Sequence, residues 1–107
     1  MQLSKNSKIF LAGHNGMVGS SILKILKKKN YKKIFTQKKN KLDLTNQKKT
    51  ADYLKKIKPD LVIIAAAKVG GIWANNNFKA DFIYTNLMIQ TNLIHAAFLA
   101  GVKKLIF

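Results

Sequence analysis

The chain has 107 residues and a formal net charge of +16, a length that accommodates one small domain. A hydrophobic fraction of 48% excludes a disordered chain, and the lack of cysteine excludes disulfides and thiolate metal sites. Every basic residue is lysine, whereas arginine is the residue that reads bases and clamps phosphates. We therefore expect no specific nucleic-acid partner, only the weak, salt-sensitive binding to polyanions that a basic surface causes.

The longest apolar run, Leu61–Ala67, is much shorter than the roughly 20 residues of a membrane-spanning helix. The polar and basic start, Met1–Lys8, lacks the apolar stretch and cleavage site of a secretory signal. The sequence therefore predicts a cytoplasmic protein without a membrane partner. Two histidines and four aspartates also leave little material for a metal site, and we expect none.

The first half of the chain predicts a strand, a helix and a second strand. The run Lys8–Ala12 is nearly continuously apolar, which is typical of a strand covered on both faces. A glycine-containing loop follows, and the next helix is expected to end near Asn30. A second strand is expected at Lys33–Thr36, followed by a basic loop. The apolar face predicted for the helix consists of Val18, Ile22, Ile25 and Leu26.

The second half continues the alternation. Thr45 or Asn46 is expected to cap a helix that ends before Pro59. Leu61–Ala66 predicts the strongest strand, and residues 68–79 predict an irregular loop. A long helix from Asp81 to Ala100, ended by Gly101, and a strand at Val102–Phe107 complete the pattern. The side chains of the long helix that are expected to be buried are Ile83, Leu87, Met88, Leu93, Ile94, Ala97 and Phe98.

This order of elements predicts an α/β fold with a doubly wound, Rossmann-like parallel sheet. No linker or repeat divides the chain, so residues 1–107 are interpreted as part of one dinucleotide-binding domain. The last predicted strand has the apolar sequence of a buried strand, and no further helix or strand follows it in this sequence. We therefore interpret the chain as the amino-terminal part of a longer protein, truncated after about four strands, with the substrate domain absent. The alternative is a self-sufficient domain of four strands.

Gly13, Gly16 and Gly19 recur at every third position between the first strand and the first helix. In a dinucleotide site the first glycine permits the tight turn and the second lets the backbone approach a pyrophosphate. The third lets the helix pack closely on the strand. The N–H groups at the start of the helix then face the phosphates. His14, within this loop, is assigned no chemistry.

The end of the second strand is where such a site selects its cofactor. An acidic residue there binds the ribose 2′-hydroxyl of NAD, whereas a basic residue accommodates the 2′-phosphate of NADP. Lys38, Lys39 and Lys41 follow the strand, with no acidic residue before Asp43. The sequence therefore predicts NADP as the cofactor.

The glycine pattern resembles that of the extended short-chain dehydrogenase/reductases, which act on nucleotide sugars. Four segments are more narrowly similar to the GDP-L-fucose synthase family: Ala-Gly-His-Asn-Gly-Met-Val-Gly at 12–19, Leu-Asp-Leu-Thr at 42–45, Ala-Ala-Ala-Lys-Val-Gly-Gly-Ile at 65–72 and Ala-Asp-Phe-Ile-Tyr-Thr-Asn-Leu-Met-Ile-Gln at 80–90. The resemblance covers residues 8–107 but only the first third of a family member.

The resemblance implies roles for particular residues. The glycine loop would hold the NADP pyrophosphate, and Lys39 stands where the family places an arginine on the 2′-phosphate. Asp43 and Leu44 would border the adenine, and the alanines would let the cofactor lie against the third strand. Asn15 and Lys39 both replace arginines of the family, and lysine offers only a point charge. The implied cofactor residues are Gly13, Asn15, Gly16, Met17, Val18, Gly19, Lys39, Asp43, Leu44, Ala65, Ala66 and Ala67.

The resemblance also implies an activity: epimerisation of a GDP-4-keto-6-deoxy-D-mannose substrate at C3 and C5, then hydride transfer from NADPH to C4, by a homodimer. The family's catalytic Tyr-x-x-x-Lys pair is absent here, because Tyr31, Tyr53 and Tyr84 are not followed by lysine four residues later. This chain is therefore expected to hold no catalytic residue. The alternatives are another nucleotide-sugar epimerase or reductase, a non-catalytic NADP-binding module, and a basic nucleic-acid-binding domain.

Overall fold

The computed structural model describes residues 3–66 and 79–107. Four parallel strands form one sheet in the order β2-β1-β3-β4. Their bounds are β1 Lys8–Ala12, β2 Lys33–Phe35, β3 Leu61–Ile64 and β4 Lys104–Ile106. In the central register, Ile9 lies opposite Ile34 of β2 and Leu61 of β3. The predicted parallel α/β sheet is thus confirmed, with the ends of β2, β3 and β4 slightly shorter than expected.

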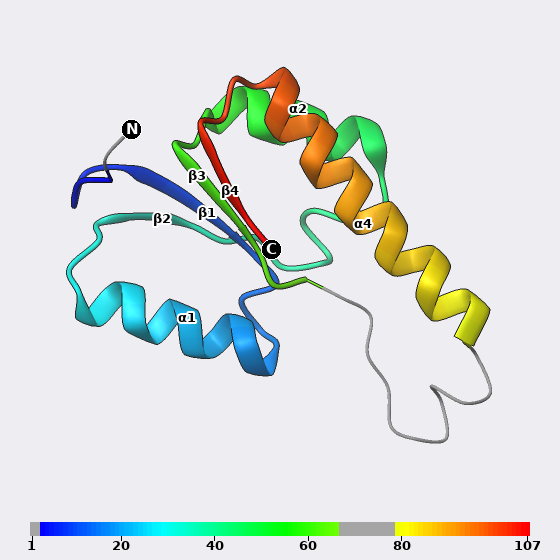
Figure 1. Ribbon diagram of the computed structural model, residues 1–107, viewed down its shortest axis with the longest axis horizontal. Helices are drawn as coiled ribbons and strands as arrows, with labels where there is room; N and C mark the ends of the chain where they lie inside the picture. Colours follow the sequence, from blue (N-terminus) through cyan, green and yellow to red (C-terminus); the bar gives the residue numbers. More distant parts are fainter. Residues whose placement is uncertain (1–2, 67–78) are drawn as a thin grey trace.

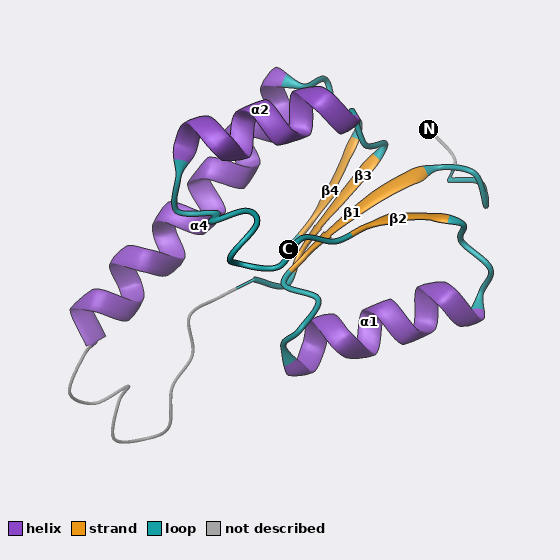
Figure 2. Ribbon diagram, turned by 180° about the vertical axis from the view of Figure 1, so that it is seen from behind, coloured by secondary structure: helices purple, strands orange, loops and turns teal. Residues whose placement is uncertain are grey.

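Helices cover both faces of the sheet, as expected for a doubly wound fold. Helix α1 (Met17–Lys28) lies on one face, and α2 (Gln47–Ile57) and α4 (Lys79–Leu99) lie together on the other (Figures 1 and 2). Strand β1 is buried between these layers: Ile9 and Leu11 pack on the α1 side, and Phe10 and Ala12 on the α2 and α4 side. Its continuous apolar sequence follows from this double cover.

The ends of the helices agree with the expected stop and cap residues. Asn46, not Thr45, is the N-cap of α2, and its side-chain oxygen accepts the Lys49 N–H at 2.9 Å. After α1 and α4 the chain turns through positive φ angles, 67° at Asn30 and 74° at Gly101. Glycine relieves the steric cost of that conformation at the second turn.

The face predicted for α1 is wrong in part. Ile22 and Leu26 pack on the sheet, but Val18 and Ile25 are 65% and 52% exposed. The helix instead turns Gly19, Ile22, Leu23 and Leu26 inward, a complete i, i+3, i+4, i+7 face. Periodicity missed this face because Gly19 adds no apolar side chain and because Val18 and Ile25 complete an equally regular apolar pattern with Ile22.

The inner face of α4 was also predicted only in part. Leu93 and Ala97 are buried, and Met88 is half-buried. Helix α4 packs beside α2, and its buried residues are Ile89, Leu93, Ala96 and Ala97. The expected core residues that are instead exposed are Ile83, Leu87, Ile94 and Phe98. In the described ranges, no helix is both long and apolar enough to cross a membrane.

Candidate functional site

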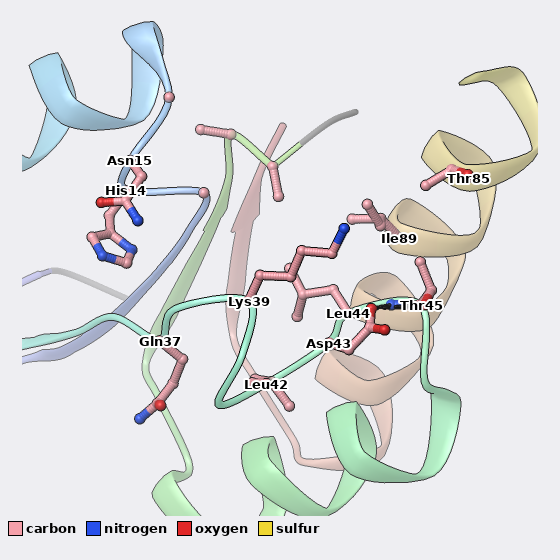
Figure 3. Close-up of a pocket in the computed structure, with 14 residues that line it drawn as sticks. His14, Asn15, Gln37, Lys39, Leu42, Asp43, Leu44, Thr45, Thr85 and Ile89 are labelled. Atoms are coloured by element: carbon pink, nitrogen blue, oxygen red, sulfur yellow. Dashed lines mark hydrogen bonds between the residues drawn. The ribbon is translucent and has the colours of Figure 1, made fainter. Parts of the chain in front are cut away.

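A pocket of about 230 Å³ opens at the carboxyl ends of β1, β2 and β3 (Figure 3). This edge of a parallel sheet, where the strand order reverses, is the usual ligand site of doubly wound folds. The glycine loop forms one wall, the segment after β2 forms the second, and α4 contributes a third. The lining residues are Gly13, His14, Asn15, Gly16, Gln37, Lys39, Leu42, Asp43, Leu44, Thr45, Ala65, Ala66, Thr85 and Ile89.

Gly13 makes the turn that brings the chain across the end of β3. Its φ angle is +89°, and a Cβ atom there would lie 2.5 Å from the backbone nitrogen of Ala66. Both the conformation and the close approach therefore require glycine. This result supports the predicted tight turn after β1.

Gly19 and Gly16 have different surroundings. Gly19 is buried, and a Cβ atom there would clash with the carbonyl oxygen of Gly13. The helix therefore packs against the loop itself, and not only against the strand as expected. A Cβ atom at Gly16 would lie 3.7 Å from its nearest neighbour, the carbonyl oxygen of Gly13, which is an ordinary contact. The protein fold thus leaves free space at Gly16.

Gly16 is also the N-cap of α1, and it carries no side chain that could bond the first N–H groups of the helix. No acidic residue lies in the first turn to neutralise the helix dipole. A phosphate or another anion beside Gly16 would bond these N–H groups directly.

The opposite wall is a compact turn after β2. The Lys38 carbonyl accepts the N–H groups of Lys41 and Leu42, both at 2.9 Å, and the Leu42 side chain is buried beneath. The Lys39 side chain extends from this turn into the opening between the glycine loop and α4 (Figure 3). Its ammonium group gives this wall a positive charge.

Asp43 places a carboxylate on the same wall. Its Oδ1 accepts hydrogen bonds from the backbone N–H and the hydroxyl of Thr45, at 3.0 and 2.7 Å (Figure 3). These bonds, with the positive charge of Lys39 nearby, hold the pKa of Asp43 below its ordinary value. The pocket wall therefore offers a fixed anionic acceptor beside a cation.

The side chain of Gln37 is held by a hydrogen bond to a residue of α2. Its amide nitrogen donates to the hydroxyl of Tyr53 at 3.3 Å, and the Tyr53 ring packs edge-on against Phe10 with centroids 5.2 Å apart. The first pocket side chain after β2 is therefore a neutral amide tied to α2.

Most of the expected cofactor residues meet at this pocket. Those that line it are Gly13, Asn15, Gly16, Lys39, Asp43, Leu44, Ala65 and Ala66. Met17, Val18 and Gly19 are not among the lining residues, and Ala67 lies outside the described residues. Met17 and Val18 are exposed at the start of α1, whereas Gly19 is buried under the loop.

Sequence reasoning missed several lining residues: His14, Gln37, Leu42, Thr45, Thr85 and Ile89. His14 and Gln37 lie inside segments that were already identified, so their positions were a usable signal. Thr85 and Ile89 come from a distant helix; they lie within the segment 80–90 that resembles the family, but that resemblance did not indicate that α4 reaches the pocket. In residues 3–66 and 79–107 there is no cluster of three or more metal-ligating side chains.

The parallel sheet, the glycine turn and the pocket at the strand ends define a Rossmann-like α/β protein. Residues 9–107 match the model of the NAD dependent epimerase/dehydratase family. The chain belongs to this family.

Individual proteins within the family are more specifically similar to this chain. The chain is 50% identical over 105 residues to the putative GDP-L-fucose synthase 2 of Arabidopsis thaliana, covering 98% of this chain and 32% of the relative. It is 44% identical over 100 residues to the GDP-L-fucose synthase of Escherichia coli (strain K12), covering 94% and 31%. Among solved structures, the chain resembles MlghC, a GDP-mannoheptose C4 reductase from Campylobacter jejuni whose structure has NADP bound. The TM-score is 0.91 and the sequence identity is 42%, and the match covers 97% of this chain and 33% of that one. The chain thus spans about a third of the length of these relatives.

Proposed function

We propose that this chain is the cofactor-binding part of an NADPH-dependent GDP-L-fucose synthase, which converts GDP-4-keto-6-deoxy-D-mannose to GDP-L-fucose. Residues 1–107 would form the amino-terminal part of its dinucleotide-binding domain. The observation that carries the proposal is the arrangement of the pocket. Gly16, which has free space beside it at the start of α1, faces the wall that carries Lys39. The 50% identity to a GDP-L-fucose synthase over nearly the whole chain supports the choice of enzyme.

The glycine wall suits the pyrophosphate of the cofactor. The free space at Gly16 lets phosphate oxygens approach the backbone, and the first N–H groups of α1 supply donors. Ala65 and Ala66 leave room for the cofactor to lie across the end of β3. Asn15 supplies a neutral amide where the family has an arginine. The backbone N–H groups therefore contribute a larger share of the binding of the pyrophosphate.

The second wall suits the adenosine half of NADP. The first two pocket-lining residues after β2 are the neutral Gln37 and the cationic Lys39, and neither carries a negative charge that would repel a 2′-phosphate. An acidic residue at the strand end, which favours NAD, is lacking there. Asp43 and Leu44 lie farther along the wall, where a carboxylate can accept a hydrogen bond from the adenine amino group.

The chemistry itself requires groups outside this chain. When bound, NADPH supplies the hydride for C4, and the residues described here bind and orient it. The Tyr-x-x-x-Lys pair that donates the proton in the family is absent from residues 1–107. We therefore assign this chain cofactor binding and no proton transfer.

A GDP-heptose C4 reductase is the second candidate function. The NADP-bound GDP-mannoheptose reductase is 42% identical to this chain, so the pocket suits both reactions. The two candidates differ in the sugar and in the epimerisation that precedes reduction. A non-catalytic NADP-binding module is the remaining alternative.

Activity of the gene product in its full natural length distinguishes these candidates. We expect NADPH oxidation with GDP-4-keto-6-deoxy-D-mannose and formation of GDP-L-fucose, identified by chromatography against a standard. Turnover restricted to a GDP-4-keto-heptose would favour the reductase. Cofactor binding without turnover of either sugar would favour the module.

We also propose a cytoplasmic homodimer without a specific nucleic-acid partner. The outer side of α4 supports self-association, because Ile83, Leu87 and Phe98 are exposed there and α4 has no charged residue after Asp81. Light scattering on the full gene product tests this assembly. Leu87→Lys should shift a dimer toward monomer, and Thr91→Lys, an exposed polar position on the same helix, is a milder comparison.

A further inference from the structure

Helix α4 turns one face toward the pocket wall that follows β2. Thr85, Ile89 and Asn92 lie at i, i+4 and i+7, which places them on one side of the helix. Thr85 and Ile89 line the pocket. One turn farther on, the Asn92 side-chain nitrogen donates to the carbonyl oxygen of Leu44 at 2.9 Å. This bond joins the pocket wall to a helix 48 residues away in sequence.

Among the residues that the structure describes, the other hydrogen bonds of this wall segment join near neighbours in sequence. The Asp43 carboxylate bonds Thr45, and the Asp43 carbonyl accepts the Asn46 N–H at 3.0 Å. These bonds give the segment its shape, and the buried Leu42 and the Leu44 side chain pack it against the core. The bond from Asn92 adds a directional attachment, because it joins the Leu44 carbonyl to a helix packed on the sheet.

Asparagine is unfavourable inside a helix, since its side chain competes for backbone hydrogen bonds. At position 92 it is half-buried and bonds a distant carbonyl instead. Replacing it by an apolar residue would remove the donor from Leu44 and leave that carbonyl with poorer hydrogen bonding.

We propose that Asn92 is a positioning residue, which holds the wall Asp43–Thr45 in place for the adenosine half of the dinucleotide. The identity of the ligand in this inference depends on the proposed function. Asn92 itself does not line the pocket and acts through Leu44.

Two variants of the full-length gene product test this role. Asn92→Leu removes the donor, and Asn92→Asp keeps the shape of the side chain but removes the N–H group. Thr91→Ala is the matched control, because Thr91 is exposed and its hydroxyl bonds only backbone carbonyls of its own helix, at Leu87 and Met88. The dissociation constants for NADPH and for 2′,5′-ADP, which carries only the adenosine half, are measured by titration calorimetry.

We expect both Asn92 variants to weaken NADPH and 2′,5′-ADP by the same factor, roughly three- to tenfold, as loss of one hydrogen bond predicts. Thr91→Ala should leave both constants unchanged. A merely structural role would lower the melting temperature and leave the affinity of the folded protein as it was. Unchanged constants in folded Asn92 variants would overturn the proposal.

Amide hydrogen exchange without ligand separates this inference from the proposed cofactor. In Asn92→Leu the N–H groups of Thr45 and Asn46 should exchange severalfold faster, whereas the Ala65 N–H, bonded to Ala12 in the sheet, should keep its rate. Equal acceleration of all three, or none, would overturn the positioning role. Failure of the parent protein to bind NADPH and 2′,5′-ADP would refute the proposed function instead, because the exchange result does not depend on a ligand.

Discussion

Gly16, the N-cap of α1, and Gly19, in its first turn, are three residues apart, yet they serve different purposes. A side chain at Gly19 would collide with the backbone of Gly13, whereas a Cβ atom at Gly16 would make only an ordinary contact, 3.7 Å from the Gly13 carbonyl oxygen. The fold therefore requires glycine at position 19, and we assign the space at position 16 to the ligand.

Two alanine substitutions separate these roles. Gly16→Ala should fold normally but weaken NADPH binding by at least about tenfold, equivalent to ~1.4 kcal/mol, because its Cβ would occupy the position that we propose for the phosphate. Gly19→Ala should instead destabilise the fold by about 1–3 kcal/mol through overpacking. Urea unfolding and NADPH titration of both variants measure the two effects. An unchanged NADPH affinity in Gly16→Ala would contradict the phosphate assignment.

The carboxylate of Asp43 makes part of the stability depend on pH. Its folded pKa lies below its ordinary value of 3.8, chiefly through the bonds from Thr45. The folded state thus keeps the group charged at pH values where the unfolded chain binds a proton. This contribution is complete above the ordinary pKa and is lost as the pH falls through the folded pKa.

Melting temperatures measured from about pH 6 down to about pH 3 test this dependence. Asp43→Asn keeps an oxygen acceptor for Thr45 but does not titrate. The parent protein should therefore lose more stability on acidification than Asp43→Asn. Parallel curves for the two proteins would show that Asp43 does not contribute to the acid dependence.

At the scale of the elements, α2 depends on its N-cap residue, Asn46, for stability. The Asn46 side chain accepts the Lys49 N–H, and no acidic residue in the first turn assists it. Asn46→Ala should lower the free energy of unfolding by about 1 kcal/mol. Asn46→Asp, which keeps the acceptor and adds a charge favourable to the helix dipole, should not. Urea denaturation of both variants checks this, and equal losses would contradict the capping role.

The elements also show what the sequence can predict. Strand β1 and the glycine turn were identifiable because continuous apolarity and glycine spacing are local signals. The inner face of α4 was not, because this helix is apolar around most of its circumference. The helix buries Ile89, Leu93, Ala96 and Ala97 and leaves Phe98 77% exposed.

At the scale of the whole molecule, the pocket unites segments from both halves of the chain. The two walls near the glycine loop and β2 were predicted, since each follows a strand and carries a recognisable pattern. The contribution of α4 was not, because Thr85 and Ile89 meet the pocket only through tertiary packing. Doubly wound topology explains the meeting, since it brings the carboxyl ends of all the strands to one edge.

The charge of +16 acts on this pocket as a whole, in addition to the local charge of Lys39. A general positive field attracts NADPH and NADH alike and weakens with salt. Only a cation next to the 2′-phosphate distinguishes the two cofactors. Lys39 lines the pocket and its neighbour Lys38 does not, so the two lysines form a matched pair for comparison.

Titration of the full-length gene product with NADPH and NADH at physiological salt tests the central claim most directly. We expect NADPH to bind at least about tenfold more tightly, a difference of ~1.4 kcal/mol. Lys39→Gln should remove most of this preference by weakening NADPH alone, and Lys38→Gln should leave it intact. Equal affinities, a preference for NADH, or no binding of either dinucleotide would contradict the assignment of this pocket to NADP.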